Sequence, residues 1–409
     1  MGKFLLLAFR NVFRNRRRTG MTLLMVGGGV AGLLLVGGFF AFMFHGLRES
    51  TIHTGLGHIQ IFTAEHFNRD EVHVLDTGIE NWQQVATRVK NGPHVKGVAP
   101  RITFYGMLSN GVKSSVYMGS AVVPEMERAM DFTPRIVDGR DLDSRAGGAV
   151  QALIGTGVAK SMSVKVGDGL TVMAVTADGA LNGIDVDVVG IVNTGFKEMD
   201  DRYLRITLPD AQRLLASDRV TNLVVGLDLT ENTDKVAAAL APQLNDPKQP
   251  LVEKKWVELA DYYKQVRTLF SGIFLFLGVI VFFMVLMASV NTLLMAMFER
   301  TREIGTMLAM GTPRGWIVAL FMLEAAVLGV LGAAVGVIGG NLLGLALNAS
   351  GLHLPPPPGT NVPMPFRVTI LPALGTAVSV MVMTTLTVAS IVPAIRASRL
   401  RIVEALAHV

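Results

Sequence analysis

Residues 21–44 read MTLLMVGGGVAGLLLVGGFFAFMF, and none of these 24 residues carries a charge. A helix that spans a bilayer needs about 20 consecutive apolar residues, so this segment is long enough to cross a membrane. It exceeds the apolar region of about 7–15 residues found in a cleaved signal peptide, and no A-x-A site follows it. We therefore expect a permanent membrane-spanning helix here.

Three more segments of similar character lie in the C-terminal part of the chain, at residues 269–298, 316–347 and 368–395. The composition agrees with a membrane protein, because half of the 409 residues are hydrophobic and only 17% are charged, against roughly a quarter in soluble domains. The same values exclude intrinsic disorder. The absence of cysteine excludes disulfides, thiolate metal sites and cysteine nucleophiles. The predicted fold is an α-helical membrane protein with four spans.

Basic residues beside the spans indicate the orientation of the chain, since loops rich in Lys and Arg stay in the cytoplasm. The N-terminal segment, the link between spans two and three, and the C-terminal tail together hold twelve basic and three acidic residues, or +9. The opposite side holds 25 basic and 28 acidic residues, or −3. Both termini are therefore expected in the cytoplasm. The net charge of +5 is then mainly a topology signal, which removes the support for nucleic-acid binding.

A long segment between spans one and two, residues 45–268, has the alternating apolar runs and Gly/Asp turns of a folded α+β domain outside the cytoplasm. Val164–Val172 predicts a strand, a Gly-Asp-Gly turn and a second strand, whereas Val186–Val192 predicts one strand. Asp210–Ser217 predicts a short helix after a proline. Glu253–Phe270 predicts one amphipathic helix running into span two, and span one is expected to continue through residues 46–54. Both extensions would form helical stalks.

The expected organisation has nine segments in chain order. They are a cytoplasmic N-terminal segment (1–20), span one (21–44), the outer domain with its stalks (45–268), span two (269–298), a cytoplasmic helix (299–315), span three (316–347), a short outer loop (348–367), span four (368–395) and a cytoplasmic tail (396–409).

No catalytic motif is recognisable in the chain. The best candidate for an ATP-binding loop, Gly155–Ser161, has Ala159 where the motif needs glycine before its lysine, and it lies in the outer domain. Five histidines with nearby acids lie close in sequence: His45, His53, His58, His66 and His73, with Glu65, Asp70, Glu71 and Asp76. Their spacings match no pair of ligands on one helical turn, so a solvated polar surface is favoured over a metal site. We expect no catalytic residue and no metal in this chain.

Two features of span three are unusual for a membrane helix. Glu324 is an intramembrane carboxylate, and such groups face a protein interior and often matter for function. A structural or coupling role is favoured over a proton relay. Glycines recur every four residues at Gly332, Gly336, Gly340 and Gly344, which predicts a close helix-packing face. Packing within one subunit and packing between subunits are equally compatible with this pattern.

The most specific local pattern is Glu299–Gly311 (ERTREIGTMLAMG), where Glu and Arg alternate before a short amphipathic helix that ends at Gly and Pro. A solvated charge run would explain the charges alone. The Ile-Gly between charged residues and the immediate return into span three favour a docking element on the cytoplasmic side.

These segments resemble the permeases of the MacB/FtsX/LolCE class, the mechanotransmission ABC transporters, and the resemblance covers nearly the whole chain. Glu299–Gly311 closely matches the signature E-R-x-R-E-I-G-x-x-x-A-x-G of that class. Other similar segments are residues 8–20 (AFRNVFRNRRRTG), Gly57–Ile61, Val166–Asp168, Thr194–Asp200, Pro393–Ala397 and Glu404–Leu406, with Ile402 standing where proline is common.

The resemblance implies a bacterial inner-membrane permease whose separate cytoplasmic ATPase dimer binds ATP and Mg²⁺, so that this chain needs no cofactor. It implies a second permease, either the same chain or a paralogue, and admits a periplasmic adaptor or acceptor protein. By position, the coupling helix that docks on the ATPase would comprise Glu299, Arg300, Arg302, Glu303, Ile304, Gly305 and Gly311.

Release of lipoproteins or lipids from the inner membrane is the favoured function, because residues 57–61 and 194–200 are similar to the lipoprotein-releasing subgroup. One alternative is MacB-like export of peptides or small molecules with an outer-membrane duct, although the usual fused ATPase domain is absent. Another is FtsX-like signalling without transport, although the outer domain of that member is usually far smaller. A membrane enzyme is disfavoured, because no catalytic constellation is present.

Overall fold

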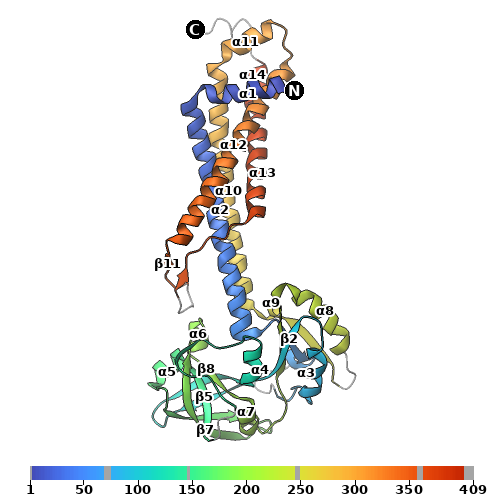
Figure 1. Cartoon of the computed structure of the whole chain (residues 1–409), viewed down its shortest axis with the longest axis vertical. Coiled ribbons are helices and arrows are strands. Elements are labelled where there is room, and N and C mark those ends of the chain that lie inside the picture. Colours follow the sequence, from blue (N-terminus) through green and yellow to red (C-terminus); the bar gives the residue numbers. More distant parts are fainter. Residues whose placement is uncertain (1, 69–74, 145–147, 245–248, 357–362, 400–409) are drawn as a thin grey trace. The chain divides into compact units, whose positions relative to one another are not determined.

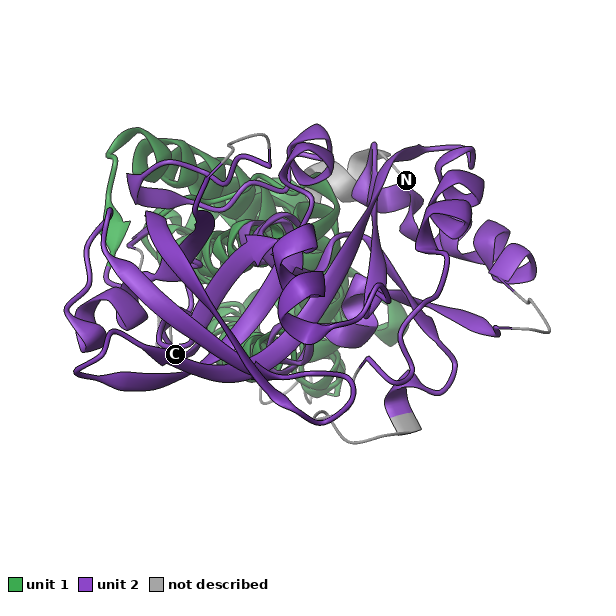
Figure 2. Ribbon diagram, turned by 90° about the horizontal axis from the view of Figure 1, so that it is seen from below, with its two compact units in different colours: residues 1–45, 266–354, 365–409 green, residues 46–265, 355–364 purple. Residues whose placement is uncertain are grey.

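The computed structural model describes residues 2–68, 75–144, 148–244, 249–356 and 363–399. The chain forms two compact units (Figure 2): unit 1 contains residues 1–45, 266–354 and 365–409, and unit 2 contains residues 46–265 and 355–364. The expected residues His73, Asp70, Glu71, Ile402 and Glu404–Leu406 lie outside the described ranges.

Unit 1 is built from helices (Figure 1), some of which begin or end in unit 2. They are α1 (Gly2–Arg14), α2 (Arg16–Thr51), α10 (Asp261–Glu299), α11 (Thr301–Ala309), α12 (Arg314–Ala349), α13 (Pro372–Ala389) and α14 (Ile391–Ser398), and two short strands follow α12, β11 (His353–Leu354) and β12 (Met364–Pro365). Within the described residues, four helical stretches are long and apolar enough to cross a membrane: Arg16–Leu56, Asp261–Glu299, Arg314–Ala349 and Pro372–Ser398. Four apolar helices are therefore present, one for each predicted span.

The fourth apolar segment becomes helical later than the hydropathy suggests. The helix begins at Pro372, which suits the first helical turn because its missing N–H needs no partner there. Val368, four residues earlier, is not helical: its backbone N–H donates to the side chain of Asn348 at 2.7 Å. Hydropathy measures the apolar character of such a segment and does not report its backbone conformation.

Unit 2 is an α+β domain. Its strands are β1 (Ile59–Thr63), β2 (Val95–Ser109), β3 (Ser114–Val122), β4 (Ile136–Gly139), β5 (Val150–Gly155), β6 (Gly169–Val175), β7 (Leu181–Val192), β8 (Tyr203–Thr207), β9 (Asn222–Leu227) and β10 (Leu251–Lys255). Its helices are the π-helix η1 (Ile52–Leu56), the 3₁₀-helices η2 (His66–Asn68) and η4 (Thr230–Asn232), and α3 (Trp82–Lys90), α4 (Pro124–Ala129), α5 (Thr156–Met162), α6 (Lys197–Asp200), α7 (Leu208–Leu215), α8 (Thr233–Leu244) and α9 (Trp256–Leu259).

The long strand β2 joins two parts of the sheet. Its first half extends the antiparallel strands β10-β1-β9, and its second half pairs with both β3 and β6. Because β6 also pairs with β7, the strands β2-β3-β8-β5-β7-β6 close into a six-stranded ring. Alternate side chains of such a ring point inward, and Leu108, Tyr117 and Val172 lie in the main hydrophobic core of unit 2.

The predicted hairpin at Val164–Val172 is only partly correct. The Gly-Asp-Gly segment does turn the chain, with Gly167 at a φ of +97°, and strand β6 follows it. Residues 164–166 are not a strand, because the backbone N–H of Val164 caps α5 by donating to the carbonyl of Ala159. Val164 is apolar because it is buried in the core, which the alternation pattern cannot distinguish from strand burial.

The single helix predicted for Glu253–Phe270 is wrong. Residues up to Lys255 form strand β10, which pairs with β1. The short helix α9 follows, and the chain leaves helical geometry at Ala260 (φ −88°, ψ 69°) before α10 begins at Asp261. The apolar repeat arose because Trp256 and Tyr263 pack together, with ring centroids 5.0 Å apart, across this break. By contrast, the helix of span one does continue through residues 46–54, as α2 and then η1.

Candidate functional site

The predicted docking element forms the short helix α11, which lies with α1 and α14 at one end of the unit 1 bundle (Figure 1). Ile304 and Gly305 are buried against this bundle, and Ile304 packs in a cluster with Ile317 of α12 and Ala394 of α14. Arg302 and Glu303 point to the exposed side. Gly311 ends the element at a φ of +87°, a conformation that favours glycine.

A buried ion pair holds the start of α11. Nη1 of Arg300 donates to Oε1 of Glu324 at 2.8 Å, and the two side chains are only 8% and 6% exposed. Nδ2 of Asn11 donates to the same carboxylate oxygen at 2.6 Å, and Nη2 of Arg300 donates to the backbone carbonyl of Asn11 at 3.0 Å. We call these three residues the Arg300 node. It ties α1, the α10–α11 corner and α12 together, so the Glu324 carboxylate accepts hydrogen bonds from two side-chain donors.

Two exposed ion pairs surround the Arg300 node. Arg14 of α1 donates to Glu303 of α11 at 2.8 Å, and Arg18 of α2 donates to Glu299 at the end of α10 at 2.7 Å. Exposed pairs of this kind contribute little stability individually. Their main effect is to pair Glu299 and Glu303 within the chain. Arg302, by contrast, has no ion-pair partner among the described residues.

A small cavity of about 20 Å³, lined by both polar and apolar side chains, lies beside the Arg300 node. Its lining includes Asn11, Glu324, Thr22 and Thr292, and the hydroxyls of the two threonines lie 3.2 Å apart. Several polar side chains therefore meet inside the bundle at this end, where α1, α2, α10 and α12 come together. The sequence indicated this only through Glu324.

The four-glycine face of α12 packs against α2 of the same chain. A Cβ atom added at Gly332 would lie 2.5 Å from Cγ1 of Val26, and one added at Gly336 would lie 2.5 Å from Cβ of Val30. Gly340 and Gly344 are buried on the same face. Only glycine permits this approach of the two backbones. The four-glycine face of α12 is thus covered by α2 of the same chain.

In unit 2, a buried polar cluster holds the π-helix η1 that follows α2. Nε and Nη2 of Arg101 on β2 donate to the two carboxylate oxygens of Glu127 at 2.8 and 2.7 Å, and Nη1 donates to the backbone carbonyl of Gly55 in η1. Burial disfavours the charged form of Glu127, but the charge and hydrogen bonds of Arg101 outweigh it and hold the pKa of this carboxyl below its usual value. The side chain of Gln60 on β1 donates to the carbonyl of Leu56 at 2.7 Å. Sequence reasoning missed this cluster, whose members are separated by tens of residues.

The remaining candidates from the sequence have structural surroundings. Among the described histidines and acids, no group of three is placed to hold a metal ion; His58 accepts a hydrogen bond from the backbone N–H of Leu227 at 3.2 Å, and His66 stacks on Phe62. At the false ATP-binding loop, the hydroxyl of Thr156 at the start of α5 donates to the carboxylate of Asp200 at 3.1 Å. An anion site is not expected where a carboxylate already lies.

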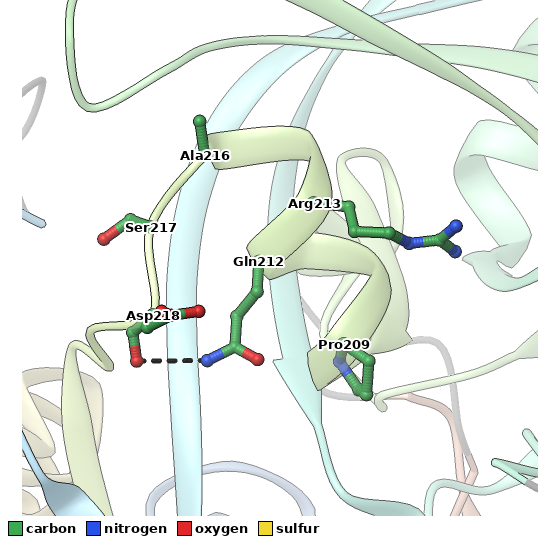
Figure 3. A pocket seen from close by; sticks show the side chains of 6 residues that line it. All are labelled: Pro209, Gln212, Arg213, Ala216, Ser217 and Asp218. Atoms are coloured by element: carbon green, nitrogen blue, oxygen red, sulfur yellow. Dashed lines mark hydrogen bonds between the residues drawn. The ribbon is translucent and has the colours of Figure 1, made fainter.

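A shallow surface hollow lies at the end of α7 (Figure 3). Gln212 donates to the backbone carbonyl of Asp218 across it at 3.0 Å, and Arg213 pairs with Asp210. These polar groups are engaged in local contacts that close the helix end. The hollow therefore offers no set of convergent groups for catalysis.

Comparisons with known proteins agree over most of the chain. Residues 19–243 match the family of MacB-like periplasmic core domains, and residues 268–402 match the FtsX-like permease C-terminal family. The chain is 25% identical over 304 residues to the lipoprotein-releasing system transmembrane protein LolE of Haemophilus influenzae, covering 71% of this chain and 68% of that protein. Other lipoprotein-releasing relatives, called LolC, match over 64–71% of their own length.

A match over the full length is also found. The chain is 24% identical over 430 residues to the uncharacterized ABC transporter permease YvrN of Bacillus subtilis, covering 98% of each protein. Among solved structures, the periplasmic region of MacB from Actinobacillus actinomycetemcomitans matches with a TM-score of 0.35 and 13% identity, covering 52% of this chain and 94% of that chain.

Proposed function

The chain belongs to the family of ABC transporter permeases with a MacB-like periplasmic core domain and an FtsX-like C-terminal domain, and from this membership we propose that it drives work outside the cytoplasm with energy from a separate ATPase. The permease would lie in a bacterial inner membrane with both termini in the cytoplasm. It would act with a cytoplasmic ATPase dimer and a second permease, either the same chain or a paralogue. ATP and Mg²⁺ would be bound by the ATPase.

The observation that carries this proposal is the geometry of α11. This helix lies between two apolar helices, exposes Arg302 and Glu303, and buries Ile304 and Gly305 against the bundle. We propose Arg302, Glu303 and Gly311 as the ATPase-facing residues of the coupling helix. Arg300 acts differently, because its buried pair with Glu324 would carry a displacement of α11 into α12. This separates the expected docking residues into an outward set and an inward set.

For the substrate, we propose lipoproteins or lipids released from the inner membrane. LolE and LolC relatives are named for lipoprotein release. The ring in unit 2 adds a physical argument, because Met107 faces Val116 and Val175 faces Leu181 in register on its outer surface. All four side chains are exposed, Leu181 by 75%. We call these four residues the apolar face, and we propose that they contact an apolar ligand or partner, because exposed apolar patches mark such contacts.

A second candidate is MacB-like export of peptides or small molecules with an outer-membrane duct. The match of residues 19–243 to the MacB-like core domain favours it. FtsX-like signalling without transport is the remaining alternative. These functions differ in what the purified complex carries, so they can be separated by identifying its cargo.

The experiment is to purify the tagged full chain from native membranes and to identify bound molecules by mass spectrometry. We expect enrichment of triacylated proteins over a mock purification. The double variant Val116→Asp/Leu181→Asp should lose that cargo, whereas a control at exposed apolar positions off the apolar face, Val137→Asp/Leu229→Asp, should retain it. Enrichment of peptides or small molecules instead, or no cargo at all, would contradict lipoprotein release.

A further inference from the structure

Helix α1 presents three different faces along its described part. On a helix with 100° per residue, Ala8, Asn11 and Val12 share one side. Ala8 and Val12 are buried, and Asn11 belongs to the Arg300 node. This side of α1 therefore packs against the helical bundle.

The second face of α1 is apolar and exposed. Phe9 and Phe13 lie one helical turn apart, with ring centroids separated by 4.9 Å, and they are 45% and 40% exposed. In a helix that lies along a membrane surface, such side chains enter the boundary between headgroups and acyl chains. These phenylalanines are the only exposed large apolar side chains within the described part of α1.

The third face of α1 and the start of α2 are strongly basic. Arg10, Arg16 and Arg17 are all exposed. Among the described residues they have no acidic partner, because the three acids at this end of unit 1 are already paired: Glu303 with Arg14, Glu299 with Arg18 and Glu324 with Arg300. Within the part of the chain that the structure describes, the charge of these three arginines is therefore unpaired.

We propose that α1 is an interfacial helix that binds anionic phospholipid headgroups through Arg10, Arg16 and Arg17, with Phe9 and Phe13 inserted beside the acyl chains. The adjacency of exposed aromatic and unpaired cationic side chains identifies the ligand, since anionic headgroups attract basic residues at a membrane surface. The same helix contacts α11 through Arg14 and Glu324 through Asn11. Lipid bound to α1 therefore steadies the position of α11, without requiring any particular substrate.

The test measures lipid selectivity of the full chain reconstituted in bilayers, using spin-labelled phosphatidylglycerol and phosphatidylcholine as probes. The wild-type chain should prefer phosphatidylglycerol. Each arginine near the surface contributes about fivefold to such binding, so Arg10→Gln/Arg16→Gln/Arg17→Gln should lower the preference by at least about tenfold. The control Lys90→Gln/Lys160→Gln/Lys165→Gln removes the same charge from exposed positions of unit 2 and should keep the wild-type preference.

Several outcomes would overturn the proposal. One is an arginine variant that keeps the wild-type lipid preference, and another is a control variant that loses as much. Loss of a co-purifying cytoplasmic protein with unchanged lipid preference would assign the arginines to a protein partner instead. The Phe13→Trp variant provides an independent check: brominated phospholipid should quench a larger share of its tryptophan fluorescence than in the wild-type chain, whose α1 contains no tryptophan, and equal quenching would contradict insertion of the aromatic pair. Both variants should unfold at the wild-type temperature in phosphatidylcholine, which shows that the fold is intact.

Discussion

Replacing Arg300 by methionine tests the Arg300 node most sharply. The substitution removes the Nη1 donor 2.8 Å from Glu324 and the Nη2 donor 3.0 Å from the carbonyl of Asn11, while filling a similar volume with apolar atoms. Glu324 is only 6% exposed and retains Asn11 as its remaining donor within this node. A carboxylate buried without its cation is the costly state.

The expected size follows from this burial. Removing one partner of a buried ion pair destabilises a protein by about 3–5 kcal/mol. That lowers the ratio of folded to unfolded molecules by about two to three and a half orders of magnitude. Replacing both partners by apolar residues of similar volume is often neutral. Arg300→Met/Glu324→Leu should therefore be more stable than Arg300→Met alone.

The assay is equilibrium unfolding of the full chain in mixed micelles, for the wild type, both single variants and the double variant. Arg314→Met serves as the control, because Arg314 is exposed and should change the free energy of unfolding by less than about 0.5 kcal/mol. An Arg300→Met variant as stable as the control would contradict a costly buried charge at Glu324. A double variant that loses the sum of the two single losses would contradict it as well.

Three further predictions concern other contacts. Arg14→Glu should reduce the ATPase activity of the assembled complex, because it breaks the 2.8 Å pair with Glu303 on the proposed docking helix; unchanged activity would show that the pair does not matter. Gly336→Val should destabilise the full chain by about 2 kcal/mol or more in the same unfolding assay, because the added Cβ would meet α2 at 2.5 Å, whereas Gly339→Val, with open space around it, should be tolerated. Burial, and then the nearby His53, lower the pKa of His58 to about 4, so the unfolded state takes up the proton first as the pH falls. The free energy of unfolding of unit 2, measured from the hydrogen exchange of its amides, should be constant above about pH 6.5. It should fall towards pH 4 by at most about 3 kcal/mol. His58→Gln should flatten this pH dependence, and an unchanged profile in that variant would contradict the assignment to His58.

The sequence predicted those features that depend on local composition. Four long apolar segments, the α+β pattern between the first two and the Glu299–Gly311 motif can each be recognised within a window of tens of residues. Contacts between distant parts of the chain cannot be predicted in this way. Asn11 and Glu324 are 313 positions apart, and no local pattern indicates that they share a hydrogen bond. For the same reason, Arg300 was grouped with the docking residues, although its burial shows that it faces the bundle.

The outer domain shows a second limit of local patterns. The apolar spacing predicts a strand at Val164 and a continuous helix at Trp256, because burial produces the same spacing in several backbone conformations. Their actual conformations are decided by partners elsewhere, namely the end of α5 for Val164 and the β10–β1 pairing just before Trp256. The buried polar cluster of Arg101 and Glu127 around η1 could not be predicted for the same reason, since Gly55, Arg101 and Glu127 lie on three separate elements.

The central claim is that α11 is the surface on which a separate ATPase docks. The chain has no cysteine, so a photo-crosslinker can be attached at a single introduced site, with Arg302→Cys on α11 and Lys160→Cys in unit 2 as the matched control. In native membranes, we expect a crosslink between position 302 and an ABC ATPase, and none from position 160. Failure to capture an ATPase from position 302, or equal capture from position 160, would contradict the claim.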